Sequence, residues 1–156
     1  MWQWAAEMSG IAVVKCFIDT NLFIYALTQS NKPQDSLKHQ QVLELFEKLL
    51  PTAQIITSVQ VVNECHFFLR RKFSLDESSV SHAIESGVLA IAQIASLELT
   101  DYHRASQLRQ HYELSYWDSL VCASALRSKA NELYSEDMQH GLVIDNRLKI
   151  INPFLA

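Results

Sequence analysis

The sequence lacks the features of a membrane or secreted protein. None of its apolar runs reaches the roughly 18 residues that span a bilayer, and residues 1–10 have neither the basic flank nor the apolar centre of a signal peptide. Its three cysteines, Cys16, Cys65 and Cys122, lie in apolar stretches without the spacing of metal ligands. An odd number of cysteines in such places is typical of reduced thiols, so we expect a cytoplasmic protein.

Internal repeats, low-complexity segments, linkers and an excess of positive charge are also missing. The 156 residues, of which 49% are hydrophobic and 19% charged, therefore predict a single globular domain. We expect an N-terminal extension over residues 1–12 and the folded domain over residues 13–156. The net charge of −4 gives no general attraction to nucleic acid, so any such contact needs a local basic patch or bound cations.

Short apolar runs alternate with amphipathic stretches along the chain. The run Ile11–Ile18 is interrupted only by Lys15, which is typical of a strand buried on both faces of a parallel sheet. Further strands are expected at 54–57, 89–94 and 132–134, with a last strand or hairpin within 141–154, and helices at 22–27, 36–50, 59–72, 75–86, 96–112 and 116–130. Strands separated by helices predict an α/β fold, a three-layer α/β/α sandwich with a central parallel sheet.

Capping residues and helix breakers set the expected helix boundaries. Ser58 or Thr57 can cap the helix at 59–72. Thr57 with Gln60, and Ser74 with Glu77, have the spacing of capping boxes ahead of two of these helices. Gly87 is expected to break the helical pattern that begins near residue 75.

Asp19 stands where the first strand ends and the next helix begins. A carboxylate at the C-terminal end of a parallel strand lies where open α/β sheets bind their ligands. Thr20 and Asn21 can then open a helix at Leu22. A simpler interpretation is that Asp19 only caps that helix.

Three other acids, Glu64, Asp118 and Asp137, occupy unusual positions. Glu64 and Asp118 each share a helix face with apolar residues, where an ionised acid is costly unless it is paired or metal-bound. Those neighbours are Val61, Phe67 and Phe68 for Glu64, and Val121, Cys122 and Ala125 for Asp118. Asp137 follows the strand expected at 132–134, which is the same placement as that of Asp19.

Each of these acids also has a purely structural explanation. Asp118, three residues after Ser115, could favour the positive N-terminus of its helix, Glu64 could pair with the basic run 70–72, and Asp137 could be an ordinary loop acid. Two strand-end acids and two core-facing helix acids can, however, converge at one edge of a parallel sheet. Such carboxylates raise one another's pKa unless cations neutralise them, and oxygen-only ligands suit Mg²⁺ or Mn²⁺ better than Zn²⁺.

Four motifs in order, IDTNLFIYAL, VVNE, YWDSLVCASAL and LYSEDMQHG, followed by INPF, resemble the signatures of the PIN domain, especially the VapC-type ribonuclease toxins. The resemblance runs from about Val14 to Phe154. It implies a compact α/β/α fold with a metal-dependent nuclease site. The implied acidic quartet is Asp19, Glu64, Asp118 and Asp137, supported by Asn21 and Ser135. Glu136 stands beside Asp137, so the identity of the fourth acid is left open.

The resemblance implies an Mg²⁺-dependent endoribonuclease, with Mn²⁺ as a substitute, that leaves 5′-phosphate and 3′-hydroxyl ends. It also implies the toxin of a type II toxin–antitoxin pair, held inactive by a small protein antitoxin and forming a homodimer or higher homo-oligomer. The helices at 36–50 and 59–72 could supply those surfaces. One alternative is a catalytically inert module that binds RNA or protein. Another is a phosphoryl-transfer domain with Asp19 as nucleophile, disfavoured because the second acid such enzymes usually need is replaced by Asn21.

Basic and aromatic residues near the acids are candidates for RNA contacts. The basic run 70–72 could guide RNA or simply suit a helix C-terminus, and Arg147 and Lys149 are a weaker option. Tyr116 and Trp117 could stack on bases, although aromatics beside an apolar helix more often belong to the core. The six histidines show no close metal-binding pair, so none is assigned a catalytic role.

Overall fold

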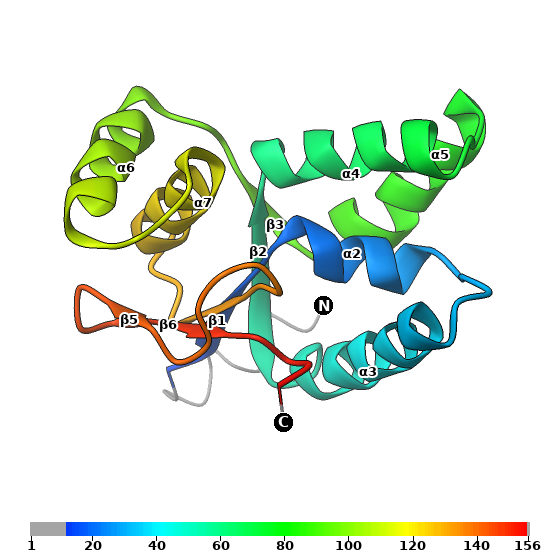
Figure 1. The fold of residues 1–156 in the computed structure, drawn as a ribbon, viewed down its shortest axis with the longest axis horizontal. Helices are drawn as coiled ribbons and strands as arrows, with labels where there is room; N and C mark the ends of the chain where they lie inside the picture. Colours follow the sequence, from blue (N-terminus) through cyan, green and yellow to red (C-terminus); the bar gives the residue numbers. More distant parts are fainter. Residues whose placement is uncertain (1–11, 156) are drawn as a thin grey trace.

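A central sheet organises residues 12–155, the part of the chain that the computed structural model describes (Figure 1). Its strands are β1 (Val14–Ile18), β2 (Ala53–Ser58), β3 (Gln93–Ala95), β4 (Glu132–Tyr134), β5 (Val143–Ile144) and β6 (Leu148–Ile151). They lie in the order β3-β2-β1-β4-β6-β5, and every neighbouring pair is parallel except β5 and β6, which form an antiparallel hairpin. The predicted, mostly parallel central sheet is therefore confirmed.

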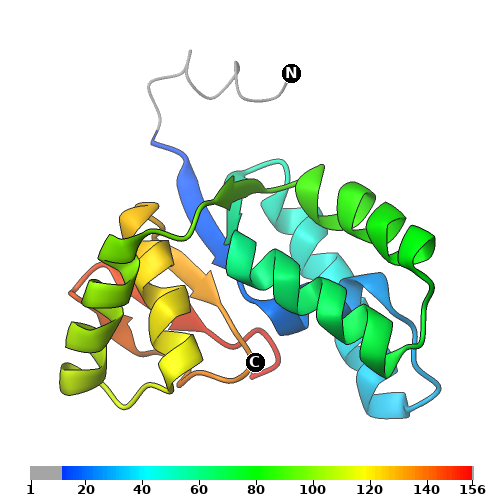
Figure 2. The same cartoon turned by 90° about the horizontal axis from the view of Figure 1, so that it is seen from above.

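Helices cover both faces of this sheet. They are α2 (Thr20–Leu27), α3 (Pro33–Leu49), α4 (Val59–Lys72), α5 (Glu77–Ile84), the π-helix η1 (Glu85–Leu89), α6 (Leu99–His111) and α7 (Tyr116–Arg127). Figures 1 and 2 show α6 and α7 packed together on one side of the sheet, with α2, α3, α4 and α5 on the other. The predicted three-layer α/β/α arrangement is therefore confirmed as well.

The C-terminal half of β1 lies in the hydrophobic core. Cys16, Phe17 and Ile18 are fully buried, whereas Val14, at the start of the strand, is exposed. The prediction of a strand buried on both faces thus holds only for its C-terminal half. The buried end of β1 is also the end that carries Asp19, and the carboxyl ends of parallel strands are where such a sheet binds its ligands.

Two helices begin earlier than predicted. Asp19 is itself the N-cap of α2, because its side chain accepts a hydrogen bond from the backbone N–H of Thr20 at 2.8 Å. The helix therefore begins at Thr20 rather than at Leu22. Pro33 opens α3, three residues before the predicted start at Ser36. Proline suits the first helical position since it has no N–H to leave unsatisfied.

Neither predicted capping box forms, but Ser58, the other predicted cap of the helix at 59–72, does cap α4. Ser58 caps α4 by accepting from the N–H of Val61 at 3.3 Å, while the hydroxyl of Thr57 donates to the carbonyl of Ile18 at 2.8 Å. Asp76 rather than Ser74 caps α5, and Ser74 instead has a positive φ of 53°. In each case a neighbouring side chain provides the cap, and sequence spacing alone does not distinguish the two.

The segment after α5 differs most from the prediction. The helix does not stop at Gly87 but continues through it as the π-helix η1, and β3 covers only Gln93–Ala95 instead of 89–94. A Cβ atom at Gly87 would lie 2.3 Å from Cδ2 of Leu27, so the close approach of η1 to α2 depends on this glycine. Further along, α6 begins at Leu99, three residues later than predicted, and α7 ends at Arg127, before Ala130.

No helix within residues 12–155 is both long and apolar enough to cross a membrane. The N-terminal extension expected over residues 1–12 falls, apart from Ala12, outside the described residues, so that division of the chain stays a prediction.

Candidate active site

One cavity, at the carboxyl ends of β1 and β4, brings all four predicted acids together. Asp19, Glu64, Asp118 and Asp137 line it, from the start of α2, from α4, from α7 and from the loop after β4 respectively. The cavity volume is about 130 Å³. The other residues on its wall are Thr20, Asn21, Gln60, Phe68, Trp117 and Val121. Side chains separated by more than a hundred residues in the sequence therefore face one small space.

Asp19 is the most buried of these acids, with 7% of its surface exposed. Its Oδ1 accepts from the backbone N–H of Thr20 and its Oδ2 from the hydroxyl of Ser135, both at 2.8 Å. Ser135 is fully buried, and its hydroxyl oxygen also accepts from the backbone N–H of Asp137 at 3.3 Å. Ser135 thus joins the two strand-end acids, which is the supporting position that the resemblance implies.

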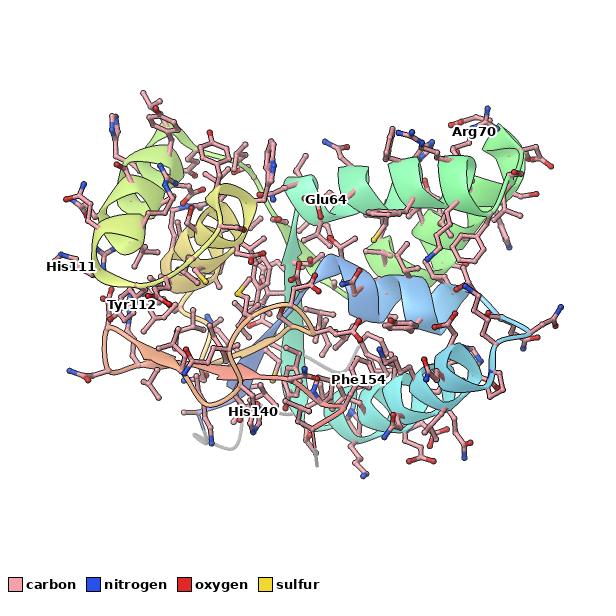
Figure 3. The ribbon with its side chains drawn as sticks, in the orientation of Figure 1. Glu64, Arg70, His111, Tyr112, His140 and Phe154 are labelled. Atoms are coloured by element: carbon pink, nitrogen blue, oxygen red, sulfur yellow. The ribbon has the colours of Figure 1, made fainter. Side chains whose placement is uncertain are left out.

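Glu64 is held by α2 and by its own helix. The hydroxyl of Thr20 donates to Oε2 of Glu64 at 2.5 Å, and the amide of Gln60, one turn earlier in α4, donates to Oε1 at 3.0 Å. Figure 3 shows Glu64 on the side of α4 that faces α2. No ion pair among residues 12–155 includes Glu64, so the alternative in which the basic run 70–72 neutralises it is wrong.

The predicted surroundings of the two helix acids are only partly correct. Behind Asp118 the neighbours Val121, Cys122 and Ala125 are buried, as predicted. Beside Glu64 only Val61 is buried, while both phenylalanines are exposed. Asp118 also lies in the first turn of α7, where its backbone N–H donates to the hydroxyl of the N-cap Ser115 at 3.1 Å. Asp118 can therefore interact favourably with the dipole of α7 and line the cavity at the same time.

The fourth acid on the cavity wall is Asp137 and not Glu136. The amide of Asn21 donates to Oδ2 of Asp137 at 2.7 Å and directs it to the cavity. Glu136 points away, because the hydroxyl of Tyr25 donates to its Oε2 at 2.9 Å and the ammonium of Lys38 binds its Oε1. Contacts with α2 and α3 therefore place Asp137 on the cavity wall and hold Glu136 away from it.

Burial, with a smaller contribution from neighbouring negative charges, raises the pKa of two of these carboxyls. Burial, with a smaller contribution from the charges of Asp118 and Glu64, raises the pKa of Asp19 to about 6 against the opposing effect of its hydrogen bonds. Burial also raises the pKa of Asp137, followed by the charges of Asp118 and Glu136. The site therefore holds its charge at a free-energy cost that a bound cation would relieve.

Two aromatic side chains border the cavity. Trp117 is 62% exposed, and Phe68, from α4, lies on the cavity wall with an exposed ring. Tyr116 is exposed as well, and its ring packs against Trp117 and under the guanidinium of Arg109, 4.9 Å from the ring centre. The interpretation of Tyr116 and Trp117 as core residues is therefore wrong.

Within residues 12–155, no group of three or more Asp, Glu, His or Cys side chains is drawn together tightly enough to hold a metal ion without rearrangement. The chemistry of the donor set nevertheless fits a divalent cation. The cavity offers four carboxylates and no sulfur or imidazole, because none of the six histidines or three cysteines lines it. Oxygen ligands of this kind are those of Mg²⁺ and Mn²⁺.

Thr20 and Gln60, which position Glu64, and the rim residue Phe68 had not been predicted for this site. Gln60 stands four residues before Glu64, a spacing at which helical side chains meet, so the sequence held a signal for that bond. For Thr20 no such signal exists, since its contact with Glu64 spans 44 residues.

A family profile described as the PIN domain matches residues 16–141. The chain therefore belongs to the PIN domain family, whose members are typically nucleases and generally use divalent metals. Among the curated proteins no match is found.

Solved structures with a similar fold include VapC toxins of VapBC toxin–antitoxin systems. VapBC2 from Rickettsia felis, bound to promoter DNA, matches with a TM-score of 0.66 and 16% identity over 89% of this chain and 100% of the other. A toxin–antitoxin complex from Klebsiella pneumoniae matches with a TM-score of 0.65 and 17% identity over 88% and 97%. VapC20 of Mycobacterium tuberculosis, a toxin that cleaves the sarcin–ricin loop, matches with a TM-score of 0.59 and 14% identity over 76% and 86%. Identities this low establish the fold alone.

Proposed function

We propose that the protein is an endoribonuclease that hydrolyses RNA phosphodiester bonds with Mg²⁺, or with Mn²⁺ in its place. The observation that carries this proposal is the convergence of Asp19, Glu64, Asp118 and Asp137 on one cavity of a PIN domain. A divalent ion held by these carboxylates would supply an activated water and stabilise the charge that develops on the scissile phosphate.

The residues around the acids keep the carboxylates ionised and in place. The N–H of Thr20 and the hydroxyl of Ser135 stabilise the charged form of Asp19. Asn21 does the same for Asp137, so each strand-end acid has a neutral donor of its own. Neutral donors orient a carboxylate without competing for its charge, which leaves that charge available for a metal ion.

We further propose that this ribonuclease is the toxin of a type II pair, inhibited by a small protein antitoxin. The toxin–antitoxin complexes among the similar structures support a partner of this kind. Exposed apolar side chains on α3 and α4, such as Leu37, Leu43 and Phe67, are available for an antitoxin or for a second copy of the chain in a homodimer. We expect the protein in the cytoplasm, since its three cysteines are buried and unpaired.

The test is RNA cleavage by the purified protein with Mg²⁺, with Mn²⁺ and with EDTA. The Asp19→Asn variant should be inactive, whereas Glu47→Gln, which removes an exposed acid on α3, should cleave like the wild type. Cleavage that persists in EDTA or in Asp19→Asn would exclude the proposed site. A protein that binds RNA or an antitoxin but cleaves no RNA would instead be the inert binding module.

A phosphoryl-transfer enzyme with Asp19 as nucleophile fits the geometry less well. The residue two positions after Asp19 is Asn21, and its amide is engaged with Asp137. A phosphoryl-transfer enzyme with an aspartate nucleophile needs a neighbouring acid to protonate the leaving group.

A further inference from the structure

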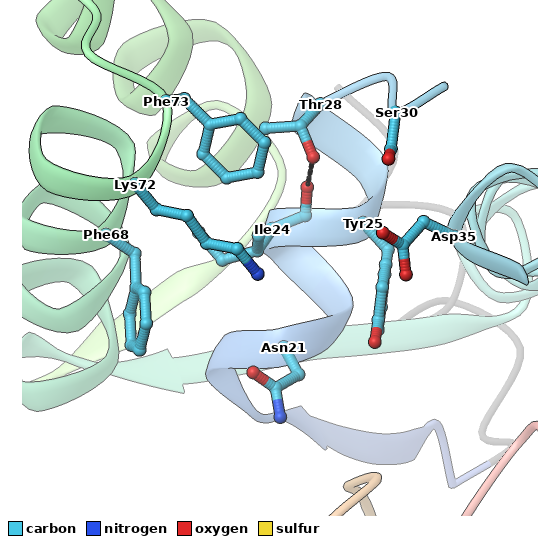
Figure 4. Close-up of a pocket in the computed structure, with 9 residues that line it drawn as sticks. All are labelled: Asn21, Ile24, Tyr25, Thr28, Ser30, Asp35, Phe68, Lys72 and Phe73. Carbon is cyan, nitrogen blue, oxygen red and sulfur yellow. Dashed lines mark hydrogen bonds between the residues drawn. The ribbon is translucent and has the colours of Figure 1, made fainter. Parts of the chain in front are cut away.

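A second groove, of about 70 Å³, adjoins the acidic cavity along α2 (Figure 4). The two spaces share the wall residues Asn21 and Phe68, so they adjoin each other at the first turn of α2. The floor of the groove is α2, and Phe68 and Lys72 of α4 form one of its walls. Asp35, at the start of α3, lies on the side away from the acidic cavity.

Lys72 is the positively charged residue of this groove. Its side chain extends from the last turn of α4 over Ile24, with the ammonium directed toward Asn21 (Figure 4). The ammonium lies 5.8 Å from the centre of the ring of Phe73, which also lines the groove, and none of the ion pairs formed among residues 12–155 includes Lys72. An unneutralised ammonium directed into a groove is available to bind an anion.

The neighbouring cations of the same helix end are engaged elsewhere. Arg70 donates to the carbonyl of Leu75 at 2.8 Å and pairs with Glu77 at 3.8 Å. The guanidinium of Arg71 lies over the ring of Phe67, 5.6 Å from its centre. The helix dipole favours all three cations, whereas the ring of Phe73 holds the ammonium of Lys72 at the groove. Of the three basic residues at 70–72, Lys72 is therefore the one whose charge faces the groove.

An RNA strand whose scissile phosphate lies at the four carboxylates must continue past the rim of the cavity. On the α4 side it meets first the exposed ring of Phe68 and then the ammonium of Lys72. An aromatic face for a base together with a cation for a phosphate is the combination that holds single-stranded nucleic acid. The carboxylate of Asp35 beyond Lys72 repels a further phosphate, which limits the groove to one nucleotide.

We propose that this groove is a nucleotide subsite, in which Lys72 binds the phosphate next to the scissile one and Phe68 stacks on the base between them. The proposal rests on the ribonuclease function and adds to it the direction in which the RNA strand leaves the acidic cavity. It assigns no role in the groove to Arg71 or Phe67.

The test compares matched variants in an Asp19→Asn background, so that RNA is bound without being cleaved. The probe is a labelled single-stranded RNA of about ten nucleotides, titrated with Mg²⁺ at one fixed concentration and with monovalent salt at several concentrations. Lys72→Ala should lower the slope of log K against log salt concentration by about 0.7, the value for one lost contact with single-stranded nucleic acid. Arg71→Ala removes the same charge from the same helix end and should leave the slope nearly unchanged, and Lys72→Arg should restore it.

A second matched pair of variants tests the aromatic side of the subsite. Phe68→Ala should weaken RNA binding about tenfold, as expected for the loss of one stacked base, whereas Phe67→Ala should have little effect. Urea unfolding of each variant shows whether it is folded before its binding is compared. Equal effects of Lys72→Ala and Arg71→Ala, or of Phe68→Ala and Phe67→Ala, would overturn the assignment and leave the groove to another occupant, such as a peptide segment of a protein partner.

Cleavage by the wild-type protein separates this proposal from the proposed function. If the wild type cleaves RNA and Lys72→Ala raises KM without lowering kcat, both proposals stand. If the wild type cleaves RNA but Lys72→Ala and Arg71→Ala have the same KM, only the subsite is wrong. If the wild type cleaves no RNA under any metal condition, the ribonuclease proposal fails and the subsite fails with it.

Discussion

Asp19→Asn should make the metal-free protein more stable at neutral pH, although it removes an acid from the proposed active site. The side-chain amide has the shape of the carboxyl and can keep both hydrogen bonds, since its oxygen can accept from the N–H of Thr20 and its nitrogen can donate to the hydroxyl of Ser135. What the substitution removes is a buried negative charge that faces Glu64 and Asp118.

The magnitude follows from the pKa of Asp19, which burial raises from 3.8 to about 6 in the folded protein. This difference between the folded and unfolded pKa of Asp19 changes the free energy of unfolding by roughly 3 kcal/mol. Because the folded pKa lies above the unfolded one, this stabilisation is fully present below about pH 4 and is lost as the pH rises through about 6. The asparagine side chain does not titrate, so the variant keeps its stability where the wild type loses it.

Urea unfolding in EDTA at about pH 4 and about pH 8 tests this reasoning. The free energy of unfolding of the variant should exceed that of the wild type by up to about 3 kcal/mol at the higher pH and by almost nothing at the lower pH. Equal stability at both pH values would refute the account of a crowded, charged cavity. That result is what a simple capping role of Asp19 predicts, since aspartate and asparagine cap helices about equally well.

The other predictions concern the fourth acid and two packing features. Asp137→Asn should abolish the rise in melting temperature that Mg²⁺ produces, whereas Glu136→Gln should retain it, because only Asp137 lines the cavity. Gly87→Ala should lower the free energy of unfolding by no more than about 1 kcal/mol in urea, because its methyl group overlaps only the end of the Leu27 side chain, which can move aside. Arg127→Met should lower the free energy of unfolding by about 3–5 kcal/mol, because it leaves Asp101, which is 1% exposed, without its ion pair. The control Arg104→Met breaks a more exposed pair with Asp145 and should cost less than about 1 kcal/mol in the same assay.

Local patterns were sufficient to predict the elements that carry the acids. The helix predicted at 59–72 and the strand predicted at 132–134 have those bounds in the structure, because apolar periodicity and adjacent polar residues mark both ends. The placement of Asp19 and Asp137 at strand ends follows from the same patterns. With a parallel sheet, these positions are enough to bring the two acids to one edge.

Contacts between distant segments account for what the sequence did not reveal. Glu136 is drawn away from the cavity by Lys38, 98 residues earlier, and by Tyr25, 111 residues earlier. No pattern within a few residues of LYSED distinguishes it from Asp137. The exposure of Tyr116 and Trp117 is of the same kind, since it depends on which elements leave the N-terminal turn of α7 uncovered.

Tertiary packing also overrode a local signal at Gly87. Glycine commonly ends a helix, which is why the pattern predicted a break there. In the structure its missing side chain instead makes room for Leu27, and the helix passes through it with π-type hydrogen bonding. The catalytic roles of the acids and the division near residue 12 stay predictions.

The most direct test of the central claim is a crystal structure of the protein soaked in Mn²⁺ at a concentration that supports RNA cleavage. The account predicts an anomalous peak in the cavity, about 2.1 Å from carboxylate oxygens of Asp19 and of at least two of Glu64, Asp118 and Asp137. A cavity without a peak, or Mn²⁺ bound only at other carboxylates, would contradict the claim that these four acids form a metal centre.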